Sequence, residues 1–311
     1  MSARYGSRTR TGEAVSGFGR AGGGGSAPIA PISATGGQML ILPDHVVHVF
    51  TGSGDFEVLS GSTTVGYAIV AGGGGGGFTQ RNMGGATGGN KGYGGGGGAG
   101  GVLSGTTPVS PGTYPIVVGA GGAYNTNGSN STGFSQTALG GGYGGGYRFG
   151  TPFSPTPGTV YFPANPGGSG GSSGGQATFQ SPGGGYADPA GPTGTGTPGQ
   201  GNPGSNHQGG SKSPTGKGTP LVSLAPPALP LAPSSDALSG IGLAQGGFTA
   251  SRTAPYARWE TTTPGLWPVA GVANTGNGGN HTATIPNPQG DETLYGTNGG
   301  SGVVYVWYAR V

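Results

Sequence analysis

Six consecutive glycines, Gly72–Gly77, directly follow the apolar, strand-like run Val65–Ala71. A glycine tract in a flexible linker normally lies among serines and other polar residues, but this tract begins where a predicted β-strand ends. Glycine blocks recur further along the chain, at Gly94–Gly98, Gly140–Gly142, Gly144–Gly146 and Gly183–Gly185. The pattern predicts that glycine is a structural material in this protein and not a spacer.

Composition separates this chain from disordered chains and from collagen. Its 80 glycines and 27 prolines make up about a third of 311 residues, as in low-complexity or fibrous chains. Disordered chains usually carry high charge and few aromatic residues, whereas here 7% of residues are charged and 8% are aromatic. Glycine holds no strict three-residue period, which excludes a collagen helix.

An ordered glycine region must offset a large entropy cost. Glycine loses more backbone freedom on folding than any other residue, and backbone ordering costs about 1–2 kcal/mol per residue. Polyglycine II, an extended threefold helix like polyproline II, has no internal hydrogen bonds, but side-by-side glycine helices can exchange N–H···O=C bonds because no Cβ intervenes. We expect such a bundle here, since strands flank the glycine region on both sides; the alternative is a solvated linker.

The segments at the two ends of the glycine region predict a β-sheet. Residues 38–71 contain only four glycines, and short turns separate their apolar runs, which predicts a β-meander. In the last predicted strand Val65, Tyr67 and Ile69 share one face. The C-terminal run Val303–Val311 is rich in β-branched and aromatic residues, and we expect it to pair with the meander.

The expected fold class is mainly β. A small antiparallel β-sheet or sandwich is formed by the N-terminal meander and the C-terminal strand, with a polyglycine II-like bundle, long loops and almost no helix. The expected domains are a basic flexible arm at 1–37 and a glycine-rich β domain at 38–311. Within that domain we expect strands at 38–71 and 303–311, a glycine-rich bundle at 72–150 and 236–302, and a proline-rich insertion or loops at 151–235.

Charge is concentrated in the arm. Arg4, Arg8, Arg10 and Arg20 against Glu13 account for its net charge of +3, which is also the net charge of the whole chain. We expect these four arginines to anchor the protein to a neighbouring subunit. The remaining charges balance, so the body lacks the clustered Lys and Arg that nucleic-acid binding requires, and no nucleic-acid partner is expected.

Other classes of site find little support. The chain has no cysteine, no apolar run of about 18 residues that would span a membrane, and no apolar core of a signal peptide after its first basic residues. Gly72–Gly77 contains G-x-G-x-x-G, but a dinucleotide site needs a helix next, which a glycine tract does not supply. Asn127-Gly-Ser and Asn130-Ser-Thr match glycan acceptor patterns but mean little without a signal peptide.

Histidines and carboxylates do not form a convincing catalytic or metal site. His45 and His48 lie three apart in a predicted strand, so they face opposite sides, and we expect them at an edge or facing solvent. Asp291 and Glu292 form an acidic pair without a candidate partner. We therefore expect no enzyme activity, no cofactor and no metal.

Two groups of aromatic and arginine residues are candidate recognition sites. Aromatic residues and arginine are typical anchors for sugars and proteins, although here they also suit small hydrophobic plugs at the ends of the bundle. The tentative receptor-binding residues are Tyr147, Arg148, Phe149, Phe153, Tyr256, Arg258, Trp259 and Trp267, with Tyr143 beside the first group.

An ordered series of motifs resembles a known family. The motifs are Val46–Phe56, Tyr67–Gly77, Gly97–Leu103, Pro111–Gly122 and Gly299–Tyr308, and their order is similar to the glycine-rich domain of bacteriophage virion proteins, found in tail fibres and tail-tip adhesins. The resemblance covers about 38–150 and 295–311, and the proline-rich middle departs from it. It implies a virion structural protein whose polyglycine II helices display variable loops to a host receptor.

Two functions follow as expectations. The first is a tail-fibre or tail-tip adhesin, with the arm bound to other virion proteins and the loops bound to a host glycan or outer-membrane protein. The second is a capsid-decorating or head-fibre protein, in which the same arm inserts among capsid subunits. Either function places the protein in the virion.

Overall fold

The computed structural model describes ten ranges of the chain. They are residues 32–81, 91–146, 166–180, 186–187, 194–201, 244, 271, 273–279, 292–294 and 296–310. The described residues contain β-strands and no α-helix. Every strand pairing among them is antiparallel, so the predicted mainly-β class is confirmed.

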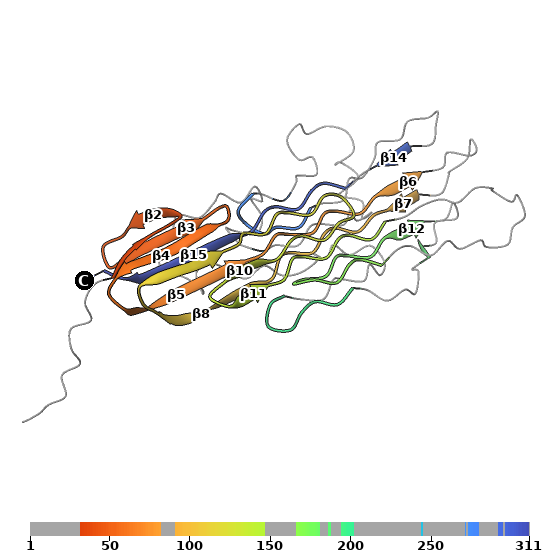
Figure 1. The fold of residues 1–311 in the computed structure, drawn as a ribbon. Coiled ribbons are helices and arrows are strands. Elements are labelled where there is room, and N and C mark those ends of the chain that lie inside the picture. The colour runs from red at the N-terminus through yellow and green to blue at the C-terminus, as the bar shows by residue number, and fades with distance from the viewer. Residues whose placement is uncertain are drawn as a thin grey trace, which may run out of the picture.

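Two sheets form a sandwich at one end of the molecule (Figure 1). The larger sheet has the order β2-β3-β15-β5-β8 and the smaller one β1-β4-β9. The large sheet consists of β2 (Gln38–Ile41), β3 (His45–Phe50), β15 (Val303–Ala309), β5 (Thr63–Val70) and β8 (Val102–Val109). The small sheet consists of β1 (Ser33–Thr35), β4 (Gly54–Ser60) and β9 (Gly112–Ile116).

The predicted meander is wrong in its pairing. Strand β2 pairs with β3 as expected, but β4 leaves their sheet and pairs with β1 and β9 in the opposite one. Between β3 and β5 lies β15, which pairs with both, so the prediction that the C-terminal strand joins the N-terminal strands is confirmed. A meander pattern records where strands end, but not which sheet each strand enters.

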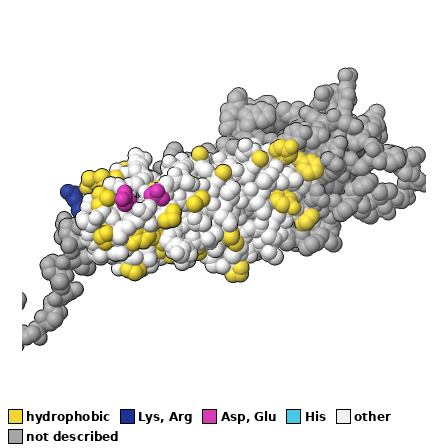
Figure 2. Space-filling view, in the orientation of Figure 1, with side chains coloured by type: hydrophobic (Ala, Val, Ile, Leu, Met, Phe, Trp, Pro, Cys, Tyr) yellow, Lys and Arg dark blue, Asp and Glu magenta, His cyan; other side chains and the backbone are white. Residues whose placement is uncertain are grey.

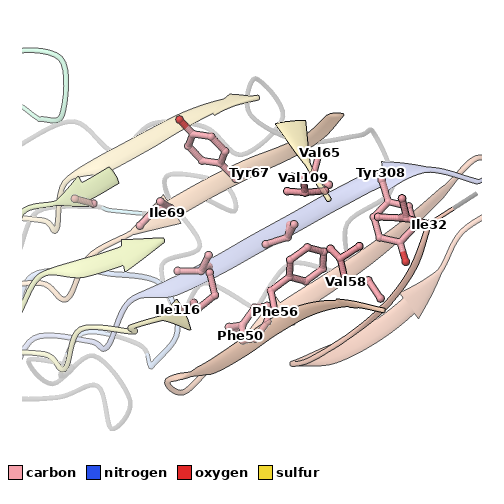
Figure 3. Packing of buried hydrophobic residues seen from close by; sticks show 14 of the residues in the cluster. Ile32, Phe50, Phe56, Val58, Val65, Tyr67, Ile69, Val109, Ile116 and Tyr308 are labelled. Carbon is pink, nitrogen blue, oxygen red and sulfur yellow. The ribbon is translucent and has the colours of Figure 1, made fainter. Parts of the chain in front are cut away.

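The sandwich core is formed by the alternating residues of both sheets (Figure 3). On β5 the side chains of Val65, Tyr67 and Ile69 all point into this core, as their spacing predicted. They meet Phe56 and Val58 of β4, which are fully buried or nearly so. Such burial provides the main stabilisation of a small sandwich, at about 25 cal/mol per Å² of apolar surface.

A tight hairpin closes one end of this core. It pairs β10 (Ser131–Gly133) with β11 (Gln136–Ala138), and its two turn residues, Phe134 and Ser135, both have positive φ. Positive φ at both turn positions is typical of a type I′ turn, whose twist suits a two-residue hairpin. The conformation directs the Phe134 ring onto Tyr67, with ring centroids 5.6 Å apart, and onto Tyr114 at 5.7 Å.

The remaining strands lie at the opposite end of the molecule (Figure 1). A two-stranded sheet pairs β14 (Glu292–Leu294) with β6 (Thr79–Arg81). A three-stranded sheet joins β13 (Tyr186–Ala187), β12 (Thr178–Gln180) and β7 (Lys91–Tyr93). Glycine-rich segments run side by side from the sandwich toward these short sheets and give the described body an elongated shape.

Candidate functional site: the glycine bundle

Gly72–Gly77 is the central helix of a hydrogen-bonded bundle. All six residues are buried, and none has a positive φ, which matches the left-handed extended helix of polyglycine II. Every N–H of the tract donates to a carbonyl of another segment. The bonds run from Gly72 to Ser129, Gly73 to Gly300, Gly74 to Gly98, Gly75 to Thr126, Gly76 to Thr297 and Gly77 to Gly95, at 2.8 to 3.0 Å.

These bonds repeat every third residue. Gly72 and Gly75 donate to Ser129 and Thr126, so a step of three along the central helix is a step of minus three along its partner. The same relation holds for the segments 297–300 and 95–98. The central helix therefore has three faces, as a threefold helix must, and each face donates to one antiparallel neighbour.

The carbonyls of the central helix contact three further segments. Gly141 and Gly144 donate to Gly72 and Gly75, again with a step of three but in the parallel direction. The segment 122–125 donates to Gly73 and Gly76 in the same way, and Gly279 donates to Gly74. Six neighbouring segments thus surround one helix, and this hexagonal packing confirms the laterally bonded bundle predicted from the glycine tracts.

Close packing explains why the central tract is pure glycine. A Cβ on Gly74 would lie closer than 3.0 Å to the backbone of Gly142, and one on Gly77 would meet Gly145 in the same way. Real Cβ atoms essentially never come that near backbone atoms. With a neighbour on every side, the central helix has no direction in which a side chain fits.

Among the described residues, outer helices have faces without a neighbouring helix, and there the sequence departs from glycine. The outer helix 139–146 carries Tyr143, which is half-buried, and the two segments 122–125 and 126–130 carry several exposed polar residues. Residues 166–177 also contribute to the bundle, since Gly171 donates to Gly140 and Gly175 donates to Gly96. They lie inside the range 151–235 for which an insertion or loops were expected, but their own sequence is rich in glycine and serine.

Two asparagine side chains replace missing backbone partners. Asn130 Oδ1 accepts the N–H of Gly140 at 2.9 Å, and Asn127 Oδ1 accepts the N–H of Tyr143 at 2.8 Å. The two acceptors, Asn127 and Asn130, are three residues apart, and so are the two donors, Gly140 and Tyr143. The side chains therefore follow the three-residue period of the bundle. The sequence singled out these asparagines only as glycan acceptor patterns; their three-residue spacing beside glycine blocks was the available signal for this structural role.

Ser131 and Gln200 bind backbone groups in a similar manner. Ser131 Oγ accepts from the N–H of Gly119 and donates to the carbonyl of Val70, both at 2.8 Å, and the side chain is fully buried. Gln200 accepts from the N–H of Leu139 through Oε1 and donates to the carbonyl of Thr137 through Nε2. These side chains join the bundle to the sandwich, and no sequence pattern identified them.

The prediction that both histidines lie at an edge or face solvent is wrong for His48. Its side chain is fully buried in the sandwich, where Nδ1 donates to the carbonyl of Gly36 at 2.7 Å and Nε2 lies 3.4 Å from the hydroxyl of Tyr308. Burial lowers the pKa of His48, and the hydrogen bond to Gly36 opposes that effect in part. The neutral imidazole fits this site because a carbonyl accepts from one nitrogen and a hydroxyl can donate to the other.

The candidate recognition and anchoring residues lie outside the described residues. This holds for Tyr147, Arg148, Phe149, Phe153, Tyr256, Arg258, Trp259 and Trp267, and for Arg4, Arg8, Arg10 and Arg20. Their neighbours in the chain are described. Gly146 precedes the first aromatic group and contacts Phe78 at the bundle end remote from the sandwich, while Ser33 pairs with Ser60 at the outer end of the sandwich.

Searches for metal and membrane sites gave negative results for the described part of the chain. Its histidines and carboxylates form no group of three that would hold a metal ion. It also has no helix long and apolar enough to cross a membrane. The glycine tract continues into Phe78 and β6 and not into a helix, which is the element that a dinucleotide-binding turn requires.

The surface of the bundle carries little charge. In Figure 2 the charged side chains gather on the sandwich, and the bundle is mostly covered by backbone and uncharged polar groups. The described carboxylates of the sandwich are Asp44, in the turn before β3, and Asp55 and Glu57, which alternate on β4 with buried Phe56 and Val58. In the described part of the bundle, hydrogen bonds of the backbone, and not ion pairs, therefore hold the segments together.

Comparison with known proteins gave one match. A family model described as a glycine-rich domain matches residues 48–309, which span the second half of β3, the bundle and all of β15. Comparisons with curated proteins and with solved structures gave no match.

Proposed function

Because this chain belongs to the glycine-rich domain family, we propose that its glycine bundle serves as a rigid stalk in a bacteriophage virion. In this role the protein is a tail-fibre or tail-tip adhesin, and loops at the remote end of the bundle bind a receptor on the host surface. The proposal rests on the resemblance of the ordered motifs to virion proteins and on the polarity of the folded body.

That polarity is the observation that carries the proposal. The first described residues and the C-terminal strand meet at the outer end of the sandwich, where Ile32 lies beside Tyr308 (Figure 3) and the C-terminus is marked in Figure 1. The chain enters and leaves the undescribed range 82–90 between β6 and β7 at the opposite end, and it enters 147–165 after Gly146, which contacts Phe78. An attachment end and a display end are thus separated by the whole length of the bundle.

The bundle suits a display scaffold for a physical reason. Its stability derives from backbone bonds that are independent of the sequences of the connecting loops, so loops can vary without loss of the scaffold. The arm with Arg4, Arg8, Arg10 and Arg20 begins at the attachment end, and the first aromatic group with Tyr147, Arg148, Phe149 and Phe153 begins at the display end. This arrangement supports anchoring by the arm and recognition by the loops.

Binding of purified protein to host bacteria tests the adhesin role. We expect the intact protein to bind host cells and to block infection in a competition assay. Replacing Arg148 and Phe149 by alanine should reduce binding, while Tyr124→Ala, at an exposed aromatic residue of the described bundle, should leave it unchanged. A protein that is folded but neither binds cells nor blocks infection would refute the adhesin role.

A truncation tests the anchoring role separately. Protein lacking residues 2–31 should still bind cells but should not be incorporated into virions. Immunolabelling of virions then distinguishes a tail position from the capsid-decorating alternative. Label on the capsid together with a failure to bind cells would favour the capsid alternative.

A further inference from the structure

The last described segment of the chain, residues 296–310, belongs both to the sandwich and to the glycine bundle. Its second half is β15, the central strand of the large sheet, and its first half is one of the six neighbours of Gly72–Gly77. Every other described element precedes it in the chain. We call residues 296–310 the closing segment.

Without β15 the large sheet has no continuous hydrogen bonding. Strand β15 pairs with β3 from Val304–Phe50 to Ala309–His45 and with β5 from Val303–Val70 to Trp307–Gly66, whereas β3 and β5 do not pair with each other. Adjacent strands lie about 4.8 Å apart, so removing β15 leaves a gap of about 10 Å. The remaining pairs, β2-β3 and β5-β8, are two-stranded and marginal alone.

The bundle depends on the same segment. Its backbone accepts hydrogen bonds from the central helix and from Gly276, and it donates to two further segments. These bonds are Gly73 to Gly300, Gly76 to Thr297, Gly299 to Gly122, Gly302 to Gly119, Gly300 to Asn277 and Gly276 to Ser301. Losing them leaves buried backbone N–H groups without partners in the centre of the bundle, which is unfavourable for each group.

We propose that the space between β3 and β5 is a strand-acceptor site and that the closing segment is its ligand. Neither the sandwich nor the bundle folds until this segment binds. The closing segment is synthesised after every other described element. A chain whose translation stops before this segment therefore stays unfolded. The fold itself then selects chains that contain the closing segment, whatever the protein binds.

The site also selects one register. Val304, Val306 and Tyr308 face the sandwich core, and a slip by one residue would turn all three to the other face. Gly66 fixes the register further, because the Trp307 indole occupies the place where a Cβ on the opposite residue would lie. The acceptor thus takes a continuously apolar strand that is buried on both faces and has one aromatic residue opposite a glycine.

Stalled nascent chains test the order of folding. The full chain, extended by a Gly/Ser linker and held on the ribosome, would be treated with protease at two linker lengths, one that keeps the closing segment in the exit tunnel and one that releases it. We expect protease resistance of residues 32–81 and 91–146 only with the long linker. Equal resistance at both lengths would overturn the proposal. A Val306→Glu chain should be sensitive at both lengths.

A nicked chain tests the acceptor site directly. A protease site placed within residues 286–290 of the full chain allows the backbone to be cut after folding, and we expect both pieces to stay together in native buffer. After denaturation and separation, the large piece should refold only when a peptide of residues 296–311 is added. Trp307 fluorescence and hydrogen exchange of Gly72–Gly77 report the sandwich and the bundle.

Two variant peptides make this test specific. Val306→Glu places an unpaired charge in the core and should weaken rebinding by at least about 100-fold. Arg310→Gln changes an exposed residue and should rebind as the unmodified peptide does. A large piece with protected Gly72–Gly77 amides in the absence of peptide would contradict the proposal, and so would equal rebinding of all three peptides.

Discussion

The side-chain oxygen of Asn130 accepts a hydrogen bond from the backbone N–H of Gly140 at 2.9 Å and so stands where a neighbouring glycine helix would place a carbonyl. This hydrogen bond shows how the backbone N–H groups at the outer face of a polyglycine II bundle find a partner. Where no further helix is present, a side chain three atoms long supplies the acceptor. The consequence for substitutions is specific, because only the acceptor matters.

Substitutions at Asn130 should separate the acceptor from the side-chain volume. Asn130→Leu leaves the N–H of Gly140 without its partner, and we expect a loss of about 1–3 kcal/mol in the free energy of unfolding. Asn130→Asp keeps an acceptor oxygen at the same position and should retain most of the stability at neutral pH. Denaturant unfolding of both variants checks this, and equal losses would contradict the proposed role of the oxygen.

The central helix should not tolerate any side chain. Gly74→Ala places a methyl group against the carbonyl of Gly142, and we expect a destabilisation of about 4 kcal/mol or more, or no folding at all. The control is Gly52→Ala in an exposed turn, where a Cβ meets nothing within 4 Å and no loss is expected. Thermal unfolding of the two variants measures the difference. A stable Gly74→Ala protein would rule out the tight packing.

Gly66 and Trp307 should behave as a coupled pair. A Cβ on Gly66 would overlap the indole, so Gly66→Ala alone should cost about 1–3 kcal/mol through overpacking. In a Trp307→Leu background the same change should cost much less, because the branched chain leaves room above residue 66. A double-mutant cycle measures the coupling energy, which should exceed about 0.5 kcal/mol. Additive effects would show that the two residues do not interact.

The free energy of unfolding should decrease as the pH falls, because of His48. Its pKa is lowered in the folded protein, so at pH values below the ordinary histidine pKa of about 6.5 the unfolded chain binds a proton that the folded chain does not. This contribution to stability is complete above about pH 6.5 and is lost as the pH falls toward the folded-state pKa. Denaturant unfolding between pH 7.5 and 5 tests the effect.

Two variants assign that pH dependence to the buried ring. His48→Gln lacks the titrating group, so its stability should change less between about pH 7 and 5, even if it is lower throughout. His45→Gln, on the same strand with a half-buried side chain, retains His48 and should keep the slope of the unmodified chain. A steep slope in His48→Gln would assign the effect to other groups.

The sequence predicted which segments form strands and glycine helices better than it predicted how these segments pair. Alternation identified β5 and its core face, and the glycine tracts identified a laterally bonded bundle, because both follow from local periods. The position of β15 between β3 and β5 could not be derived, since pairing between residues about 260 apart leaves no local signal. The burial of His48 was missed for the same reason: Tyr308, one of its partners, lies at the far end of the chain.

The candidate site was predicted in part. Close approach of glycine backbones required no side-chain information, so the sequence was sufficient to predict it. The roles of Asn127 and Asn130 required knowing which outer faces lack a neighbour, and this depends on the number of helices in the bundle. Tyr147 and Trp259 stay candidate recognition residues, because they lie outside the described residues.

The hydrogen bonds of the bundle run across its long axis, and this has a mechanical consequence. A force applied between the sandwich end and the remote end pulls neighbouring helices along one another, so the bonds of Gly72–Gly77 to their six neighbours are loaded together in shear and not one after another. Rupture then requires many bonds to fail at the same moment. A body of this kind transmits tension along its length with little extension.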